Sequence, residues 1–185
     1  MSERVCPVWI GYLLASPIRK MFQNPLTILQ PYIKEGMKVL DIGSAMGFFS
    51  IPMSKMVGNN GKVFSLDLQK KMLETLGKRA NKAGVIDRIE LRNCSAGSLN
   101  INDLKDEIDF ALAFAVLHEV NDVSTLFKEV YTSLKSKGRL LIAEPKGHVD
   151  EKDFSKTLQV AKENGFVFLM QPRIAKSLTA LLEKN

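Results

Sequence analysis

The 185-residue chain contains only two cysteines, Cys6 and Cys94, and they lie far apart in the sequence. Two isolated cysteines cannot build a disulfide framework or a zinc cluster, and neither has neighbours typical of a catalytic nucleophile. We therefore expect no metal site. The scarcity of cysteine also favours a reducing compartment, and we expect the protein to be cytoplasmic.

Long hydrophobic runs are also missing from the sequence. No segment approaches the ~18 consecutive apolar residues needed to cross a bilayer. The apolar residues 5–15 lie where a secretory signal would lie, but Glu3 occupies the region that should be basic and Pro7 interrupts the apolar stretch. We therefore expect neither membrane insertion nor export.

The third feature that the chain lacks is a concentrated block of basic charge. The formal net charge is +6, yet lysines and arginines are scattered and few aromatic residues lie among them. Nucleic-acid-binding segments usually carry basic clusters or basic residues interleaved with aromatic ones. The charge pattern therefore disfavours nucleic acid as a partner, although an RNA substrate stays open as an alternative.

The most informative segment that is present is Lys38–Gly47, which reads KVLDIGSAMG. Its first half is a short apolar run, typical of a strand buried on both faces. Gly43 then permits a tight turn and the close approach of a ligand to the backbone. The pattern of Gly47–Val57 predicts a helix, and free N–H groups at a helix start favour an anionic group of a ligand.

Asp41 lies just before this turn and restricts which ligand fits. A carboxylate there repels the pyrophosphate of a dinucleotide but attracts an ammonium group. S-adenosylmethionine carries both a carboxylate and an ammonium group, so it suits the turn and the acid together. A nicotinamide-dependent oxidoreductase remains an alternative, because it shares the strand, the turn and an acid after the next strand.

That next strand is predicted in Lys62–Leu68, which reads KVFSLDL and ends in Asp67. In Rossmann-type folds an acid about 20 residues beyond the glycine turn accepts hydrogen bonds from ribose hydroxyls. Asp67 lies at that distance and at the tip of the second strand. The sequence therefore predicts a nucleoside-binding site between the two strand ends.

Together these motifs resemble the class I S-adenosylmethionine-dependent methyltransferase family, and the resemblance extends over almost all of the chain from Met37 onward. The later segment Leu134–Pro145, LKSKGRLLIAEP, resembles the family's helix end, glycine turn and fifth strand. The cofactor implied is S-adenosyl-L-methionine. The residues that the resemblance assigns to the cofactor are Asp41, Gly43, Ser44, Gly47, Asp67, Leu68, Cys94, Ser95 and Phe114.

Two positions depart from the usual family pattern. Ala45 stands where the family usually has glycine; its added methyl group is tolerated if φ stays negative, and we expect cofactor binding to survive. Cys94 and Ser95 follow the third predicted strand, where the family often has an acid that contacts adenine. We expect a backbone N–H or the Ser95 hydroxyl to take over that contact.

The order of strand and helix patterns predicts an α/β fold with a parallel sheet. Residues 166–171 and 177–182 are strand candidates joined by a loop too short for a crossover helix, so they should pair antiparallel. The resemblance implies a Rossmann-like, mostly parallel seven-stranded sheet with a C-terminal antiparallel hairpin and helices on both faces. Asp109, at the start of a strand, is expected to be structural.

We expect two parts of the chain to differ in role. Residues 1–36 are predicted to form an N-terminal helical segment broken by prolines, which is a candidate lid. Residues 37–185 are predicted to form the methyltransferase domain that binds S-adenosylmethionine. The oligomeric state does not follow from the sequence.

The segment Phe114–Val120, FAVLHEV, leaves the fourth predicted strand beside the expected methyl position. It lacks the motif by which related enzymes hold a target nitrogen. His118 and Glu119 are its candidate catalytic residues, because imidazole titrates near neutral pH and carboxylates transfer protons. The alternative is that His118 only packs locally. Glu144 either binds nearby N–H groups or contacts substrate.

These observations predict in-line methyl transfer to a small-molecule acceptor. Alignment of the two reactants alone is worth ~7–11 kcal/mol, so a dedicated base is optional. The non-enzymatic alternative is a cofactor-binding module that has lost catalysis and works through a partner.

Overall fold

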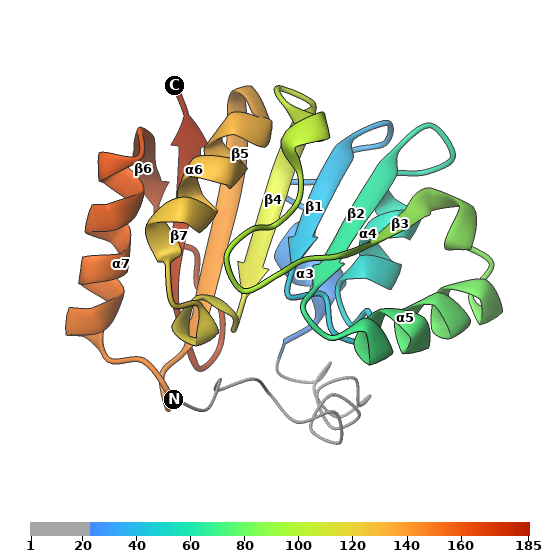
Figure 1. Ribbon diagram of the computed structural model, residues 1–185, viewed down its shortest axis with the longest axis horizontal. Coiled ribbons are helices and arrows are strands. Elements are labelled where there is room, and N and C mark those ends of the chain that lie inside the picture. The colour runs from blue at the N-terminus through green and yellow to red at the C-terminus, as the bar shows by residue number, and fades with distance from the viewer. Residues whose placement is uncertain (1–22) are drawn as a thin grey trace.

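The computed structural model describes residues 23–185, which form a seven-stranded sheet with the strand order β3-β2-β1-β4-β5-β7-β6 (Figure 1). Most of the predicted N-terminal segment, including Cys6, falls outside the described residues. The strands are β1 Lys38–Ile42, β2 Lys62–Asp67, β3 Ile89–Asn93, β4 Ile108–Phe114, β5 Leu134–Pro145, β6 Phe166–Met170 and β7 Ser177–Lys184.

The sheet combines a parallel part with an antiparallel hairpin at one edge. Strands β1 to β5 pair parallel with one another, whereas β7 pairs antiparallel with both β5 and β6. The loop between β6 and β7 is too short for a crossover helix, so the two strands form a hairpin. The predicted fold class is therefore confirmed, including the position of the hairpin.

Five helices of at least one α-turn accompany the sheet in the described part of the chain. Helix α6 begins after Asp122, and the Asp122 carboxylate caps it by accepting the Thr125 N–H at 3.0 Å. Helix α4 begins at Ser50 rather than at Gly47, where the sequence predicted its start. The helices are α3 Pro25–Leu29, α4 Ser50–Met56, α5 Lys70–Lys82, α6 Val123–Ser133 and α7 Glu151–Glu163.

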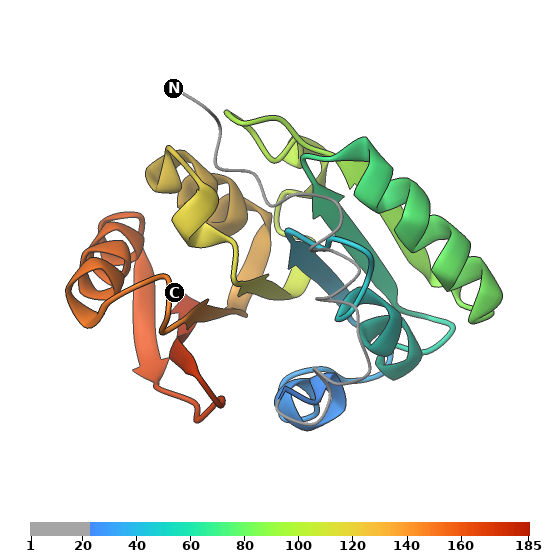
Figure 2. The same cartoon turned by 90° about the horizontal axis from the view of Figure 1, so that it is seen from below.

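Central strand β4 shows how the two faces of the sheet are covered. Phe110 and Leu112 point into a core formed with α3 and α4, while Ala111 and Ala113 point into the core formed with α6 and α7. Figure 2 shows α3 and α6 on opposite sides of the sheet. Side chains alternate between the faces of a strand, so β4 is apolar and buried on both sides from Phe110 to Phe114.

Asp109 lies at the amino end of the parallel strands. Its carboxylate accepts the Lys38 N–H at 2.8 Å and pairs with Lys135 Nζ at 2.7 Å. These contacts join β1, β4 and the start of β5 at the edge opposite the expected ligand site. The predicted structural role of Asp109 is confirmed.

Candidate cofactor and acceptor site

Asp41, on β1, is almost fully buried and binds the first residue of α4. Its Oδ2 accepts the Ser50 hydroxyl at 2.5 Å, and the two side chains are 2% and 0% exposed. A buried carboxylate needs such hydrogen bonds to remain stable. Asp41 therefore fixes α4 against β1. Ser50 could not be singled out from the sequence, because a helix start at Gly47 places it inside the helix.

The glycine turn after β1 is held by its own backbone. Gly43 has φ +70° and Gly47 has φ +82°, as the tight turn requires. The Ser44 N–H donates to Leu66 O at 2.8 Å and the Gly47 N–H donates to Ser44 O at 2.9 Å. These two N–H groups are therefore not free for a ligand, which corrects the prediction of a helix start with open donors. Within residues 23–185, the buried Ser44 hydroxyl has no hydrogen-bond partner.

Ala45 adopts φ +45°, so the condition of a negative φ is not met. The left-handed region costs a non-glycine residue roughly 1–2 kcal/mol. The Ala45 N–H donates to Asp67 Oδ2 at 2.9 Å. This hydrogen bond to a carboxylate links the turn to the end of β2 and helps to hold Ala45 in the left-handed conformation.

Replacing Ala45 by glycine is expected to stabilise the fold. Relief of the left-handed strain outweighs the added freedom of the unfolded chain, so the free energy of unfolding should rise by up to about 1 kcal/mol. Chemical denaturation measures the change. Ala83→Gly is the matched control, because Ala83 has φ −84° at the end of α5 and its replacement should destabilise. Equal effects at both positions would contradict the strain at Ala45.

Asp67 faces the turn from the end of β2. Its two oxygens accept the Ala45 N–H at 2.9 Å and the Gln69 N–H at 2.8 Å. Burial raises the pKa of Asp67, and these two hydrogen bonds oppose that rise. Each carboxylate oxygen has two lone pairs, so both can accept a further hydrogen bond from a ligand.

Leu68 and Asn93 complete the surroundings of Asp67. Leu68 is 41% exposed, which provides an apolar surface directly beside the carboxylate. The Asn93 side-chain amide donates to the carbonyls of Asp67 and Leu68, both at 2.9 Å. Asn93 therefore fixes the backbone of this segment. Sequence reasoning missed it, since only its place at the end of β3 distinguishes it.

Cys94 and Ser95 lie beside Asp67 but are engaged in local contacts. Burial, followed by the nearby Asp67 charge, raises the pKa of the Cys94 thiol to about 11, so Cys94 stays a neutral thiol. The Ser95 N–H and hydroxyl both point to Ser98 O, at 2.9 and 3.3 Å. An adenine contact through either Ser95 donor would therefore compete with this turn.

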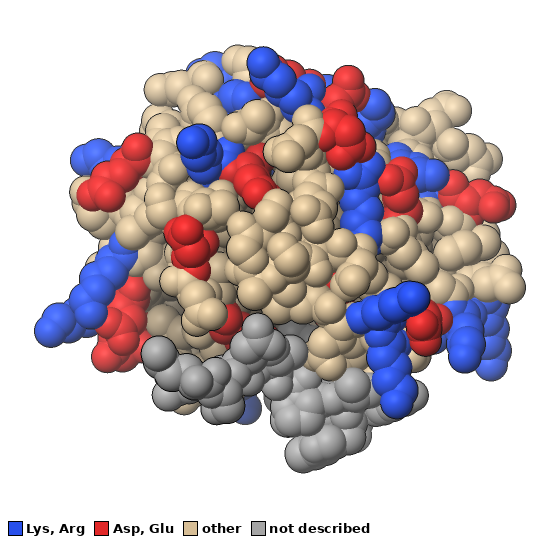
Figure 3. Space-filling model, viewed as in Figure 1, with Lys and Arg blue, Asp and Glu red and all other residues tan. Residues whose placement is uncertain are grey.

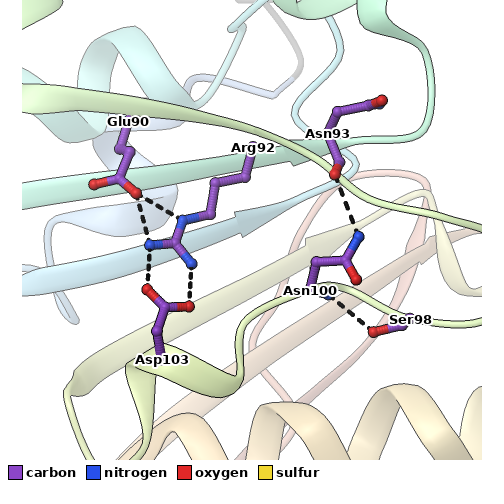
Figure 4. Close-up of polar contacts among 6 residues, drawn as sticks. All are labelled: Glu90, Arg92, Asn93, Ser98, Asn100 and Asp103. Carbon is purple, nitrogen blue, oxygen red and sulfur yellow. Dashed lines mark hydrogen bonds and ion pairs between the residues drawn. The ribbon is translucent and has the colours of Figure 1, made fainter.

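Ion pairs and amide contacts hold the chain after β3 in place (Figure 4). Arg92 forms two hydrogen bonds to the Asp103 carboxylate, at 2.6 and 2.7 Å. The Asn100 side chain donates to Asn93 O at 3.5 Å, and the Asn100 N–H donates to Ser98 Oγ at 3.0 Å. The segment between β3 and β4 is thus held against β3 through Asn100 and Asp103.

Phe114 and the loop after β4 form the other wall of the site. Phe114 packs against Phe49 with ring centroids 4.6 Å apart, and both rings are mostly buried. Val116 lies so close to Gly43 that a Cβ at Gly43 would come within 2.6 Å of Val116 Cγ2. Glycine is therefore needed at position 43 for two reasons: it leaves room for Val116, and it readily adopts the positive φ.

Glu144, at the end of β5, organises the same loop. It is 1% exposed, and its Oε1 accepts the N–H groups of Val116 and Leu117, both at 3.0 Å. Its Oε2 accepts the His118 N–H at 3.4 Å and lies 2.5 Å from His118 Nδ1. Of the two roles considered for Glu144, the structure shows binding to nearby N–H groups.

His118 has a side chain that is 22% exposed, and its Nε2 lies 4.0 Å from Glu119 Oε1. The hydrogen bond to Glu144 is the main cause that raises the pKa of His118, and the charges of Glu144 and Glu119 add to it. A carboxylate can only accept, so Nδ1 carries the proton and Nε2 is the nitrogen left for base chemistry.

Known proteins resemble the chain in sequence and in fold. The methyltransferase domain family matches residues 33–183. Over 132 residues the chain is 32% identical to the ubiquinone/menaquinone biosynthesis C-methyltransferase UbiE of Haemophilus ducreyi, covering 71% of this chain and 50% of that protein. A SAM-dependent methyltransferase from Aquifex aeolicus superposes with a TM-score of 0.85 at 22% identity, covering 97% of this chain and 98% of the other.

A second curated relative is named as a probable cobalt-precorrin-6B C(15)-methyltransferase (decarboxylating) of Saccharolobus solfataricus. The identity is 34% over 94 residues, which are 50% of this chain and 47% of the relative. The chain thus spans about half the length of both curated relatives. With the family match and the sheet order, the chain belongs to the class I S-adenosylmethionine-dependent methyltransferase family.

Proposed function

We propose that this protein is an S-adenosylmethionine-dependent methyltransferase that acts on a small-molecule acceptor. The observation that carries the proposal is Asp67, a buried carboxylate beside the glycine turn, next to the exposed Leu68. This arrangement suits a ribose with an adjoining base. The remaining proposed cofactor contacts come from Asp41, Gly43, Ser44, Gly47, Cys94, Ser95 and Phe114.

The unpartnered hydroxyl of Ser44 supports this assignment. A buried hydroxyl without a hydrogen bond is costly, and a ligand that supplies a partner removes the cost. Bound S-adenosylmethionine supplies an activated methyl group on a sulfonium. In this proposal Asp67 binds the ribose, Leu68 covers the adenine, and His118 with Glu119 accepts a proton from the acceptor.

The proposed acceptor is small and fairly apolar. Both curated relatives are named for methylation of small molecules at carbon. On the face drawn in Figure 3, basic and acidic side chains interleave rather than form a basic surface. Small-molecule sites are typically concave and apolar with a few polar groups, as Phe49, Phe114 and His118 would provide. We propose a cytoplasmic location, and among residues 23–185 no helix has the length and apolarity to cross a membrane.

Methyl-labelled cofactor tests the proposed function. The protein is incubated with it and with a fractionated cell extract, and the products are separated into small molecules, RNA and protein. Label in a small molecule supports the proposal, whereas label only in RNA or protein contradicts it. Absence of label in every fraction, with S-adenosylhomocysteine still bound, favours the non-catalytic alternative.

Residues 1–36 are also proposed to contribute a lid. Gln23 Nε2 donates to Ala175 O at 3.3 Å and to Ser177 Oγ at 3.4 Å. Ser177 pairs with Pro145, at the carboxyl end of β5. Gln23, the first described residue, therefore lies near the edge of the sheet where ligands bind in open α/β folds.

Deletion of the residues before Pro25 should reduce turnover more than cofactor affinity. A lid mainly encloses the acceptor, so we expect turnover to fall roughly 10-fold or more. Titration calorimetry with S-adenosylhomocysteine should show nearly unchanged affinity. Equal losses of affinity and turnover, or no loss of turnover, would count against the lid.

A further inference from the structure

Glu144 is a buried carboxylate for which the proposed function gives no direct role. All of its hydrogen-bonding capacity is used by one loop: two backbone N–H groups bind Oε1, while the His118 N–H and Nδ1 bind Oε2. A carboxylate offers about four lone-pair sites. No site remains for a substrate, and the side chain is 1% exposed.

We infer that Glu144 is the positioning residue for the proton acceptor His118, an inference that rests on the proposed function. Glu144 holds His118 in the form with the proton on Nδ1, which leaves Nε2 unprotonated for the reaction. It also fixes the ring, because the same carboxylate binds the N–H groups of Leu117 and of His118 itself. A histidine paired in this way is oriented and ready to accept a proton.

This arrangement also points to a class of acceptor. In the reaction the acceptor O–H or C–H loses its proton to His118 Nε2, and a bond forms between that oxygen or carbon and the methyl carbon. The S–CH₃ bond breaks, and its electron pair stays on sulfur. The Glu144 carboxylate compensates the imidazolium charge. An acceptor with a weakly acidic proton, such as a phenol, an enol or an activated carbon acid, needs this assistance, whereas a thiolate does not.

Three titratable side chains face His118 in the described part of the chain. Glu144 touches Nδ1, Glu119 Oε1 lies 4.0 Å from Nε2, and the His148 ring centroid lies 5.5 Å away. Both carboxylates favour the charged imidazolium. Their effects can be separated because each can be replaced by an uncharged amide of the same shape.

The variant Glu144→Gln provides the sharpest test. Its amide oxygen can still accept the N–H groups of Val116 and Leu117, which keeps two of the three backbone contacts of the loop. Its NH₂ group, however, would face Nδ1 and force the proton onto Nε2, the reacting nitrogen. NMR of the ring nitrogens should therefore show a lower pKa for His118. In the neutral ring, the proton should lie on Nε2 instead of Nδ1.

The matched variant Glu119→Gln should lower the His118 pKa less, because the contact with Glu144 is the larger cause. It should leave the protonated nitrogen unchanged. With a turned-over acceptor, wild-type activity should rise with pH through the pKa of His118, since the base must be neutral. In Glu144→Gln this rise of activity should occur at lower pH, and the maximal activity reached above it should be lower by roughly 10-fold or more.

His118→Gln and the double variant with Glu144→Gln keep the test decisive if the loop is disturbed. The double variant should lose no more turnover than His118→Gln alone, because groups that act as a unit are not additive. An unchanged His118 pKa and tautomer in Glu144→Gln, or additive losses, would overturn the inference. Failure of the wild-type protein to bind S-adenosylhomocysteine would instead overturn the proposed function.

Discussion

Replacing Asp67 by alanine is expected to weaken S-adenosylhomocysteine binding roughly 10- to 100-fold. Hydrogen bonds from ribose hydroxyls to a carboxylate are charge-assisted and contribute ~1.5–3 kcal/mol, and each 1.4 kcal/mol is a factor of ten. Asp67 also accepts the Ala45 and Gln69 N–H groups, so its loss releases the glycine turn. Titration calorimetry measures the affinity.

Two further variants separate these contributions. Asp67→Asn keeps the size of the side chain and one accepting oxygen, so it should retain one of the two backbone contacts and disturb the turn less than Asp67→Ala, while losing the charge-assisted part of the affinity. Asp103→Asn removes an acid that binds Arg92 at the far end of the neighbouring loop and should leave affinity unchanged. Unaltered affinity in Asp67→Ala would refute the ribose assignment.

The pH dependence of binding should follow from the same carboxylate. Burial raises the pKa of Asp67, so its charge is lost at a higher pH than for an exposed aspartate. Affinity should therefore fall on acidification as pH drops through this raised value. In Asp67→Asn that part of the pH dependence should disappear.

The sequence predicted the sheet well because the determining features are local. Strands β1, β2 and β4 are short, mostly apolar runs, and side chains on both faces of β4 are buried, which the periodicity already indicates. The hairpin followed from the short loop between β6 and β7. Asp41 and Asp67 could be placed because each comes directly at the end of such a run.

The parts that failed depend on contacts between segments distant in the sequence. The left-handed φ at Ala45 is supported by its hydrogen bond to Asp67, 22 residues later. The roles of Asn93 and Glu144 appear only when β3 lies beside β2 and β5 beside β4. No periodicity or composition encodes these pairings of side chain with backbone, so the sequence left two roles open for Glu144.

Replacing Gly47 by alanine should destabilise the protein by about 2–4 kcal/mol. The left-handed φ of +82° is unfavourable for alanine, and the new Cβ would lie 2.1 Å from Leu76 Cδ1 of α5. The buried Leu76 side chain, α5 or the glycine turn itself must therefore shift. Chemical denaturation measures the loss, and cofactor affinity should fall with it.

Gly84→Ala is the matched control for this prediction. Gly84 has φ +67°, but a Cβ added there would have no atom within 4 Å, so only the backbone strain of ~1–2 kcal/mol applies. The difference between the two variants isolates the contact of Gly47 with α5. Shortening Leu76 to valine in the Gly47→Ala background removes the clashing atom and should recover part of that difference. Equal destabilisation at Gly47 and Gly84, without rescue by Leu76→Val, would show that α5 does not constrain the glycine turn.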